Sequence, residues 1–197
     1  MAKSENHIRI LIDGCLKGNR FHQRELYECF YGYGLKIALR YAQNREEGTE
    51  ILNDAFLKVF NKIHQFDANQ PFKAWFRQVL IHAAIDYHRA YHKFPKLVKL
   101  EPVHDVEDDE LPLPVLSADE NVLPLIQNLP PQYRMVFNLY VMEEYDHREI
   151  ATLLGISEST SRANLARAKE KLRDMILAQK AANGVHFNIK KEIFKNG

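Results

Sequence analysis

One stretch of the chain has no lysine or arginine, and it divides the sequence into an N-terminal and a C-terminal part. Between Lys99 and Arg134 there is no lysine or arginine, and six of the eight prolines lie there. The stretch also holds eight carboxylates: Glu101, Asp105, Glu107, Asp108, Asp109, Glu110, Asp119 and Glu120. Acidic, proline-rich sequence without a helical period buries too little apolar surface to fold alone. Residues 101 to about 120 are therefore predicted to form a flexible, extended linker.

The charge of the remaining chain points to a class of partner. The whole sequence has a net charge of +1, from 27 basic and 26 acidic residues. Without the eight linker carboxylates, 27 basic residues face 18 acidic ones, which is a net charge of +9. Two basic bodies joined by an acidic linker suggest a polyanionic partner such as nucleic acid.

Both bodies are predicted to be helical. Glycine and proline are scarce outside the linker, and apolar residues recur at three- and four-residue steps. The predicted helices are 4–17, 21–43, 46–64, 70–93, 119–128, 131–142, 146–154 and 158–179. The fold class is all-α, as two small helical domains. The predicted divisions are an N-terminal domain at 1–94, a linker at 95–120, a C-terminal domain at 121–180 and a tail at 181–197.

Several classes of protein are excluded or disfavoured. No run of about 18 uncharged apolar residues occurs, so no membrane insertion is expected. The N-terminal residues lack the apolar stretch of a secretory signal, and the protein is expected to be cytoplasmic. The two cysteines, Cys15 and Cys29, have no metal-ligand spacing and are expected to be reduced and buried.

The predicted helix 70–93 has one apolar stripe and two polar faces. The stripe consists of Phe72, Phe76, Val79, Leu80, Ala83 and Tyr87. The polar residues are Lys73 and Arg77 on one face, and His82, Asp86, Arg89 and Lys93 on another. Taken alone, this pattern favours a helix that only packs against a core over one whose polar side binds a ligand.

The C-terminal body carries a more specific pattern. Ile150, Leu153 and Leu154 give a short helix its buried stripe, and Gly155 can end that helix with a positive φ. Ser157 is placed to cap a longer helix, on which Leu165, Leu172 and Ile176 are predicted to face inward. This order is typical of a helix-turn-helix, whose second helix enters the major groove. The second helix would present Arg162, Asn164, Arg167, Lys169, Lys171 and Arg173. A helical hairpin with a solvated basic face is the alternative.

At this point the sequence resembles a known family. The segment "LPPQYRMVFNLYVMEEYDHREIATLLGISESTSRANLARAKEKL" is similar to the C-terminal DNA-binding domain of bacterial sigma factors. The segment "EEGTEILNDAFLKVFNKIHQFDANQPFKAWFRQVLIHAAIDYHRAYHK" is similar to their N-terminal domain. The acidic linker replaces the middle domain of larger sigma factors, as in the extracytoplasmic-function (ECF) subfamily. The resemblance covers about residues 8–178.

The resemblance implies a role for the helix 70–93 at the promoter minus-ten element. The implied DNA contacts are Lys73, Arg77, His82, Asp86 and Arg89. The preceding loop, residues 64–70, corresponds to the element that captures a flipped base. For Trp75, packing within the domain is favoured over a role in strand separation.

The resemblance also implies protein partners and a second promoter contact. Glu50, Asn53 and Asp54 share one helical face and match positions that bind the clamp helices of the largest subunit of core RNA polymerase. The flap of the second-largest subunit is the expected partner of the C-terminal domain, and an anti-sigma factor is a further candidate. The implied minus-thirty-five contacts are Thr160, Arg162, Ala163, Asn164, Ala166, Arg167 and Lys169.

Two rival interpretations start from other features. The two-helix output domain of response regulators shares part of the C-terminal pattern, but it would require a receiver or sensor domain, and the N-terminal body shows no alternating strand pattern. A zinc enzyme could start from His88 and His92, which share a helix face, but no third ligand is identifiable. The sequence therefore predicts a protein that is not an enzyme and that needs no cofactor or metal.

The linker has three possible roles. In the family the equivalent segment threads toward the active-site cleft of the polymerase, where acidic side chains would mimic nucleic acid. One alternative is a passive tether between the two domains. The other is that the linker rests on the basic domains of its own chain when the protein is free, and hides them from non-specific DNA.

Overall fold

The computed structural model describes residues 5–91 and 122–182, and these residues form helices and no strand. The N-terminal elements are α1 (Glu5–Leu16), α2 (Arg20–Tyr41), α3 (Arg45–Lys62), the 3₁₀ turn η1 (Ile63–Gln65) and α4 (Phe72–Tyr91). The C-terminal elements are α5 (Leu123–Gln127), α6 (Pro131–Phe137), the π-helical turn η2 (Asn138–Met142), α7 (His147–Leu154) and α8 (Glu158–Ala182). The all-α prediction is confirmed. The acidic linker and residues 183–197 of the tail lie outside the described residues, and the domain boundaries stay predictions.

The helix ends follow from local capping groups. Asn19 precedes α2, and its side-chain oxygen accepts a hydrogen bond from the Phe21 N–H at 2.9 Å. Asn44 does the same for α3 through the Glu47 N–H at 2.9 Å. These side chains satisfy N–H groups that the first turn of a helix leaves without a partner.

Two predicted helices differ from the structure. The one predicted at 119–128 begins, among described residues, only at Leu123. The one predicted at 131–142 is α-helical as far as Phe137 and then widens into η2, where the Glu143 N–H donates to the Asn138 carbonyl at 3.1 Å. A five-residue spacing of this kind is a π turn, which apolar periodicity alone does not predict.

The N-terminal core lies between α2, α3 and α4. Phe56 and Phe76 are buried with ring centroids 4.8 Å apart, and Leu80 is fully buried one turn further along α4. Gly34 lets α2 approach α3 closely, because a Cβ at this position would lie 2.5 Å from Leu52 Cδ1. Of the predicted apolar stripe on α4, Val79 and Tyr87 are half-buried and the other members are buried.

The C-terminal core is formed by α6, α7 and α8. Its buried side chains include every residue that the sequence places inward on the long helix: Leu165, Leu172 and Ile176. On α7, Ile150 and Leu154 are buried as predicted, whereas Leu153 is only half-buried.

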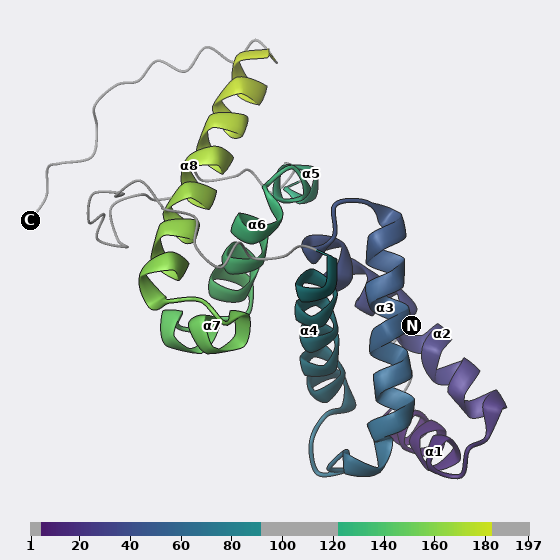
Figure 1. The fold of residues 1–197 in the computed structure, drawn as a ribbon. Coiled ribbons are helices and arrows are strands. Elements are labelled where there is room, and N and C mark those ends of the chain that lie inside the picture. The colour runs from purple at the N-terminus through teal and green to yellow at the C-terminus, as the bar shows by residue number, and fades with distance from the viewer. Residues whose placement is uncertain (1–4, 92–121, 183–197) are drawn as a thin grey trace, which may run out of the picture.

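The two halves are in contact with each other (Figure 1). Helices α5 and α6 contact α2, and α7 contacts α4. The charge pattern predicts two bodies but does not predict this contact between them. The contact determines which faces of the predicted DNA-binding helices remain open.

Candidate nucleic-acid and polymerase interfaces

Helices α7 and α8 form the predicted helix-turn-helix. Asp146 and Glu149 make a reciprocal capping box at the start of α7: Asp146 Oδ1 accepts from the Glu149 N–H at 2.7 Å, and Glu149 Oε2 accepts from the Asp146 N–H at 2.9 Å. Gly155 ends α7 with φ of +68°. Ser157 Oγ then accepts from the Thr160 N–H at 3.0 Å and caps α8. The local chemistry thus sets both the length of α7 and the start of α8.

The side chains predicted to contact the minus-thirty-five element differ in exposure. Arg162 is exposed on the first turns of α8, 3.6 Å from the Glu158 carboxylate. Ala163, Ala166, Arg167 and Lys169 are partly exposed. These residues leave one side of α8 accessible to a ligand.

Two predicted contacts of α8 are used inside the protein. Asn164 is 2% exposed, because α8 packs its face against α5, α6 and α7, so its side chain is not available to a DNA phosphate in this structure. The prediction for Asn164 therefore disagrees with the structure. The Thr160 hydroxyl lies 2.8 Å from Ser157 Oγ within the cap.

A buried polar pair that the sequence analysis did not identify joins the two helices. His147 Nδ1 lies 2.8 Å from Ser161 Oγ, and the imidazole stacks on the Tyr140 ring at 4.6 Å. Both His147 and Ser161 are buried. Their contact connects the first turn of α7 to the first turn of α8.

The five residues predicted to contact the minus-ten element all lie on α4, but they face two different environments. Lys73 and Asp86 interact within the N-terminal half: Lys73 Nζ lies 4.5 Å from the centre of the Tyr33 ring, and Asp86 pairs with Lys58 at 2.5 Å. The other three face the C-terminal half.

Arg77, His82 and Arg89 form the side of α4 that meets the C-terminal half. Arg77 Nε donates to Glu143 at 2.5 Å, and its Nη2 donates to the Met142 carbonyl at 3.0 Å. Arg89 donates to the Leu153 carbonyl. His82 is exposed and lines an open hollow with residues of α7 and the turn before it. These side chains are brought together by the contact between the halves.

Trp75 packs within its own domain. Its ring centroid lies 5.3 Å from Phe66 and 5.8 Å from Phe72, in tilted arrangements that are typical of aromatic packing. The geometry favours a packing role, and it fixes the turn at the end of η1 against α4.

The predicted polymerase-binding residues lie together on α3. Glu50, Asn53 and Asp54 are exposed and line one open groove. Asn53 Oδ1 accepts a hydrogen bond from the Tyr27 hydroxyl at 3.1 Å. Burial, and secondarily the charges of Glu47 and Glu50, raise the pKa of the neighbouring Tyr87 of α4 to about 12.

Leu57 extends the same surface by one turn. Its side chain is 61% exposed. An apolar side chain next to three polar ones is the composition expected of a protein-binding surface, where an apolar anchor is surrounded by polar groups.

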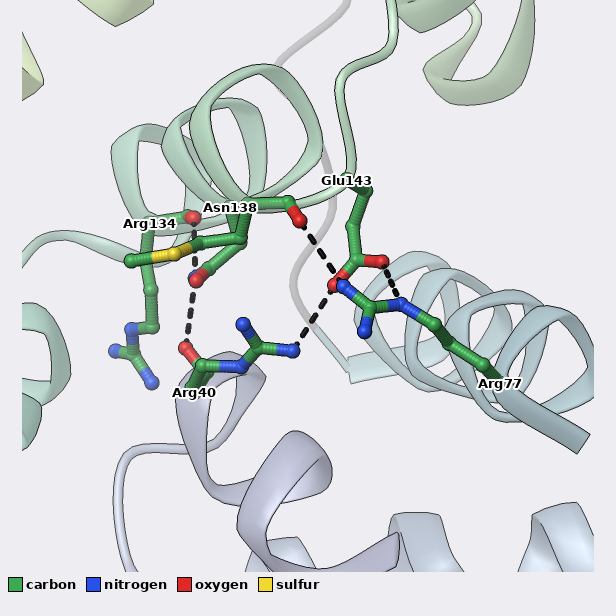
Figure 2. A network of polar contacts seen from close by, with 6 residues as sticks. Arg40, Arg77, Arg134, Asn138 and Glu143 are labelled. Atoms are coloured by element: carbon green, nitrogen blue, oxygen red, sulfur yellow. Dashed lines mark hydrogen bonds and ion pairs between the residues drawn. The ribbon is translucent and has the colours of Figure 1, made fainter. Parts of the chain in front are cut away.

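The residues that join the two halves were not predicted from the sequence: Arg40, Gln127, Arg134, Asn138 and Glu143. Figure 2 shows four of them around Arg77. One signal was available, because Arg134 and Asn138 interrupt an otherwise apolar segment at a four-residue spacing. Both are buried, and buried polar side chains usually have a specific partner.

Neither a metal site nor a membrane segment is found in the described part of the chain. No cluster of three metal-ligating side chains occurs in residues 5–91 and 122–182. His88 is buried in α4, and His92 lies outside those ranges. None of the described helices is both long enough and apolar enough to span a bilayer.

Comparisons with known proteins identify a family for each half of the chain. Residues 26–94 match the family described as Sigma-70 region 2, and residues 119–172 match Sigma-70, region 4. The ECF RNA polymerase sigma factor SigM of Bacillus subtilis is 26% identical over 161 residues, which cover 76% of this chain and 91% of that protein. SigW of the same organism, also an ECF sigma factor, is 24% identical and covers 81% and 91% of the two chains.

Among solved structures, one similar chain is that of CnrH in complex with the cytosolic domain of CnrY. It is 20% identical, covers 87% of this chain and 98% of that chain, and has a TM-score of 0.43.

The region 2 match also accounts for the N-terminal half, which a response-regulator output protein would not have. With region 2 and region 4 in order along the chain and ECF sigma factors as relatives, the protein belongs to the sigma-70 family and is an ECF-type sigma factor, which directs RNA polymerase to promoters.

Proposed function

We propose that the N-terminal domain (1–94) holds and helps to melt the minus-ten element, while the C-terminal domain (121–180) reads the minus-thirty-five element. The observation that supports this most strongly is the capped helix-turn-helix. It leaves the Arg162 and Arg167 side of α8 accessible and buries the opposite side. An arginine on this side of α8 can donate two hydrogen bonds to a guanine edge. Lys169, further along, is placed to neutralise a phosphate.

The polymerase-binding surface in this proposal is the exposed face of α3. Glu50, Asn53 and Asp54 would contact the clamp helices of the largest subunit, with Leu57 as an apolar anchor one turn further along α3. The flap of the second-largest subunit would bind the C-terminal domain.

The polar side of α4 is proposed to hold the displaced strand of the minus-ten element. Lys73, Arg77 and Arg89 supply positive charge along about four turns of the same helix. Unstacking a base costs a few kcal/mol, so neighbouring charges and a binding pocket must compensate for it. His82 and Asp86 would contribute polar contacts next to that pocket.

The remaining functional assignments follow from this role. A sigma factor regulates transcription and catalyses no reaction of its own, and it acts where the core polymerase is, in the cytoplasm. An anti-sigma factor is a candidate partner in this proposal. The acidic linker would lie in a basic channel of the polymerase.

Run-off transcription tests the proposed function. Purified core polymerase is mixed with the protein and a library of promoter fragments, and the transcripts are sequenced. We expect a restricted set of start sites, with two shared sequence elements upstream. Start sites no different from those of core alone would contradict the proposal.

A further inference from the structure

One hydrogen bond links the proposed polymerase-binding face of α3 to a neighbouring helix. The Tyr27 hydroxyl of α2 donates to Asn53 Oδ1 of α3 at 3.1 Å. Asn53 is exposed and Tyr27 is half-buried, so the bond is made at the edge of the face that Asn53 shares with Glu50 and Asp54. A side chain of α2 thus contacts one of the three residues assigned to the polymerase.

The core fixes the position of the Tyr27 hydroxyl. The centroid of the Tyr27 ring lies 4.7 Å from that of Phe56 and 5.5 Å from that of Tyr31. Phe56 is 2% exposed and belongs to the core between α2, α3 and α4. A tyrosine side chain has only two torsions that move its ring, and packing against neighbouring rings restricts both. The hydroxyl is therefore a fixed donor beside a mobile, exposed side chain.

A fixed donor at the oxygen also determines where the rest of the Asn53 side chain points. A carboxamide is planar, with an oxygen that accepts hydrogen bonds and an NH2 group that has two donors. When the oxygen is turned toward Tyr27, the NH2 group is directed away from it. Because Asn53 is exposed, this NH2 group is accessible to an acceptor on another molecule.

The other helix that flanks α3 makes a similar approach. Tyr87 of α4 is half-buried, and its ring centroid lies 4.6 Å from that of Tyr91. Burial first, and then the charges of Glu47 and Glu50 and a hydrogen bond to Glu50, raise the pKa of Tyr87 to about 12. Its hydroxyl is therefore protonated at neutral pH and can donate to the Glu50 carboxylate. Tyrosines from both flanking helices thus lie next to polar residues of the face.

Holding a polar side chain in the free protein has a consequence for affinity. A mobile side chain loses conformational freedom when it becomes part of an interface, and this loss corresponds to about two- to tenfold in affinity. A side chain that is already held in its bound orientation avoids most of this loss.

We propose that Tyr27 is a positioning residue for polymerase binding: its hydroxyl holds the Asn53 carboxamide with the NH2 group directed outward, toward an oxygen acceptor on the polymerase. The inference rests on the proposed function of the α3 face. Glu50 and Asp54, beside Asn53 on this face, are carboxylates, so the complementary partner surface carries positive charge around that acceptor. Tyr27 acts through Asn53 and does not itself touch the polymerase.

A double-mutant cycle between Tyr27 and Asn53 tests the proposal. Tyr27→Phe removes the hydroxyl and keeps the ring with its packing. The cycle compares the wild type, Tyr27→Phe, Asn53→Ala and the double variant. Tyr31→Phe is the matched control, because Tyr31 is half-buried one turn further along α2 and packs against the same ring. The affinity of each labelled protein for purified core polymerase is measured by titration, and its stability by chemical denaturation.

We expect Tyr27→Phe to weaken binding to core about threefold, and Asn53→Ala to weaken it at least as much, since the second change removes the donor itself. In the Asn53→Ala background, Tyr27→Phe should have no further effect, because the two residues share one interaction. A general loss of stability would instead weaken binding alike in both backgrounds, so the cycle separates positioning from folding. Tyr31→Phe should bind core like the wild type.

The inference is overturned if Tyr27→Phe binds core like the wild type, if it weakens binding equally with and without Asn53, or if Tyr31→Phe costs as much. Asp54→Ala distinguishes this failure from that of the proposed function. If Asp54→Ala weakens binding while Tyr27→Phe or Asn53→Ala does not, only the positioning role is wrong. If none of the three substitutions changes the affinity, the assignment of the α3 face to the polymerase is wrong as well.

Discussion

The imidazole of His147 and the hydroxyl of Ser161 meet at 2.8 Å in the buried space between α7 and α8. Asp146 caps the first of these helices and Ser157 the second, so the buried pair lies directly between two capped helix starts. A buried polar contact thus joins the two helices of the helix-turn-helix inside a largely apolar core.

Ser161→Ala is expected to lower the free energy of unfolding by about 1–3 kcal/mol, because it leaves the buried imidazole nitrogen without its partner. Chemical denaturation followed by circular dichroism measures this. Ser159→Ala removes an exposed hydroxyl that lies 2.8 Å from Ser157 Oγ, and it should cost less, because water can replace the lost partner at this exposed site. Equal effects of the two substitutions would remove the buried pair as the cause.

A glycine-to-alanine substitution is expected to lower the stability of the protein at one position and to raise it at another. Gly155 has φ of +68°, whereas Gly32 lies exposed inside α2, and a Cβ at either position would meet no atom within 4 Å. Gly155→Ala should destabilise by about 1 kcal/mol through backbone strain alone. Gly32→Ala should stabilise by up to about 1 kcal/mol, because alanine favours the helix. Thermal unfolding of both variants tests the pair, and a stabilising Gly155→Ala would contradict the left-handed turn.

Asp54→Ala is expected to weaken binding to core polymerase while folding changes little, since the carboxylate is exposed. Titration of labelled protein with purified core measures the affinity. Asp13→Ala, at an exposed position on α1, serves as the control for loss of one negative charge. Unchanged affinity of the Asp54 variant would remove this face of α3 from the polymerase interface.

Arg162→Ala or Arg167→Ala should each cost about 1–3 kcal/mol in promoter recognition if the arginine reads a guanine, and the loss should concentrate at one base pair. Lys169→Ala should weaken binding about equally on all sequences. Transcription from a panel of single-base promoter variants separates the two patterns. A uniform loss for all three substitutions would show that these side chains contact only the backbone.

The two cysteines should differ in reactivity. Burial raises the pKa of Cys15 to about 11, and the side chain is 4% exposed, whereas Cys29 is only partly buried. Because the thiolate is the reactive form, Cys15 should be alkylated far more slowly than Cys29 at pH 8. Mass spectrometry after a timed iodoacetamide pulse measures both rates. Faster labelling of Cys15 would indicate that α1 opens away from α2.

Features that repeat along a helix could be predicted from the sequence, because a three- and four-residue period reports which side of a helix is buried. This is why the inward positions Leu165, Leu172 and Ile176 were identified correctly. Capping residues act locally, so the starts of α7 and α8 were also within reach.

Features that depend on contacts between distant segments could not be predicted in this way. Asn164 follows an exposed arginine and looks like part of the basic face, yet its burial depends on where α5 and α6 lie. The pairing of Arg77 with Glu143 spans 66 residues, and nothing in either local sequence indicates the partner.

The number of residues in the π turn η2 determines the direction in which the Glu143 side chain points. Successive residues of an α-helix are rotated by about 100° around its axis, so one residue more or fewer changes the direction of every side chain that follows. Here the turn from Asn138 to Glu143 spans five residues instead of four. A one-residue deletion in η2 would keep Arg40, Arg77 and Glu143 and would still rotate the Glu143 carboxylate away from Arg77. Relatives that have a glutamate in the corresponding segment therefore need not form the same ion pair, because the position of the glutamate along the turn matters as well as its charge.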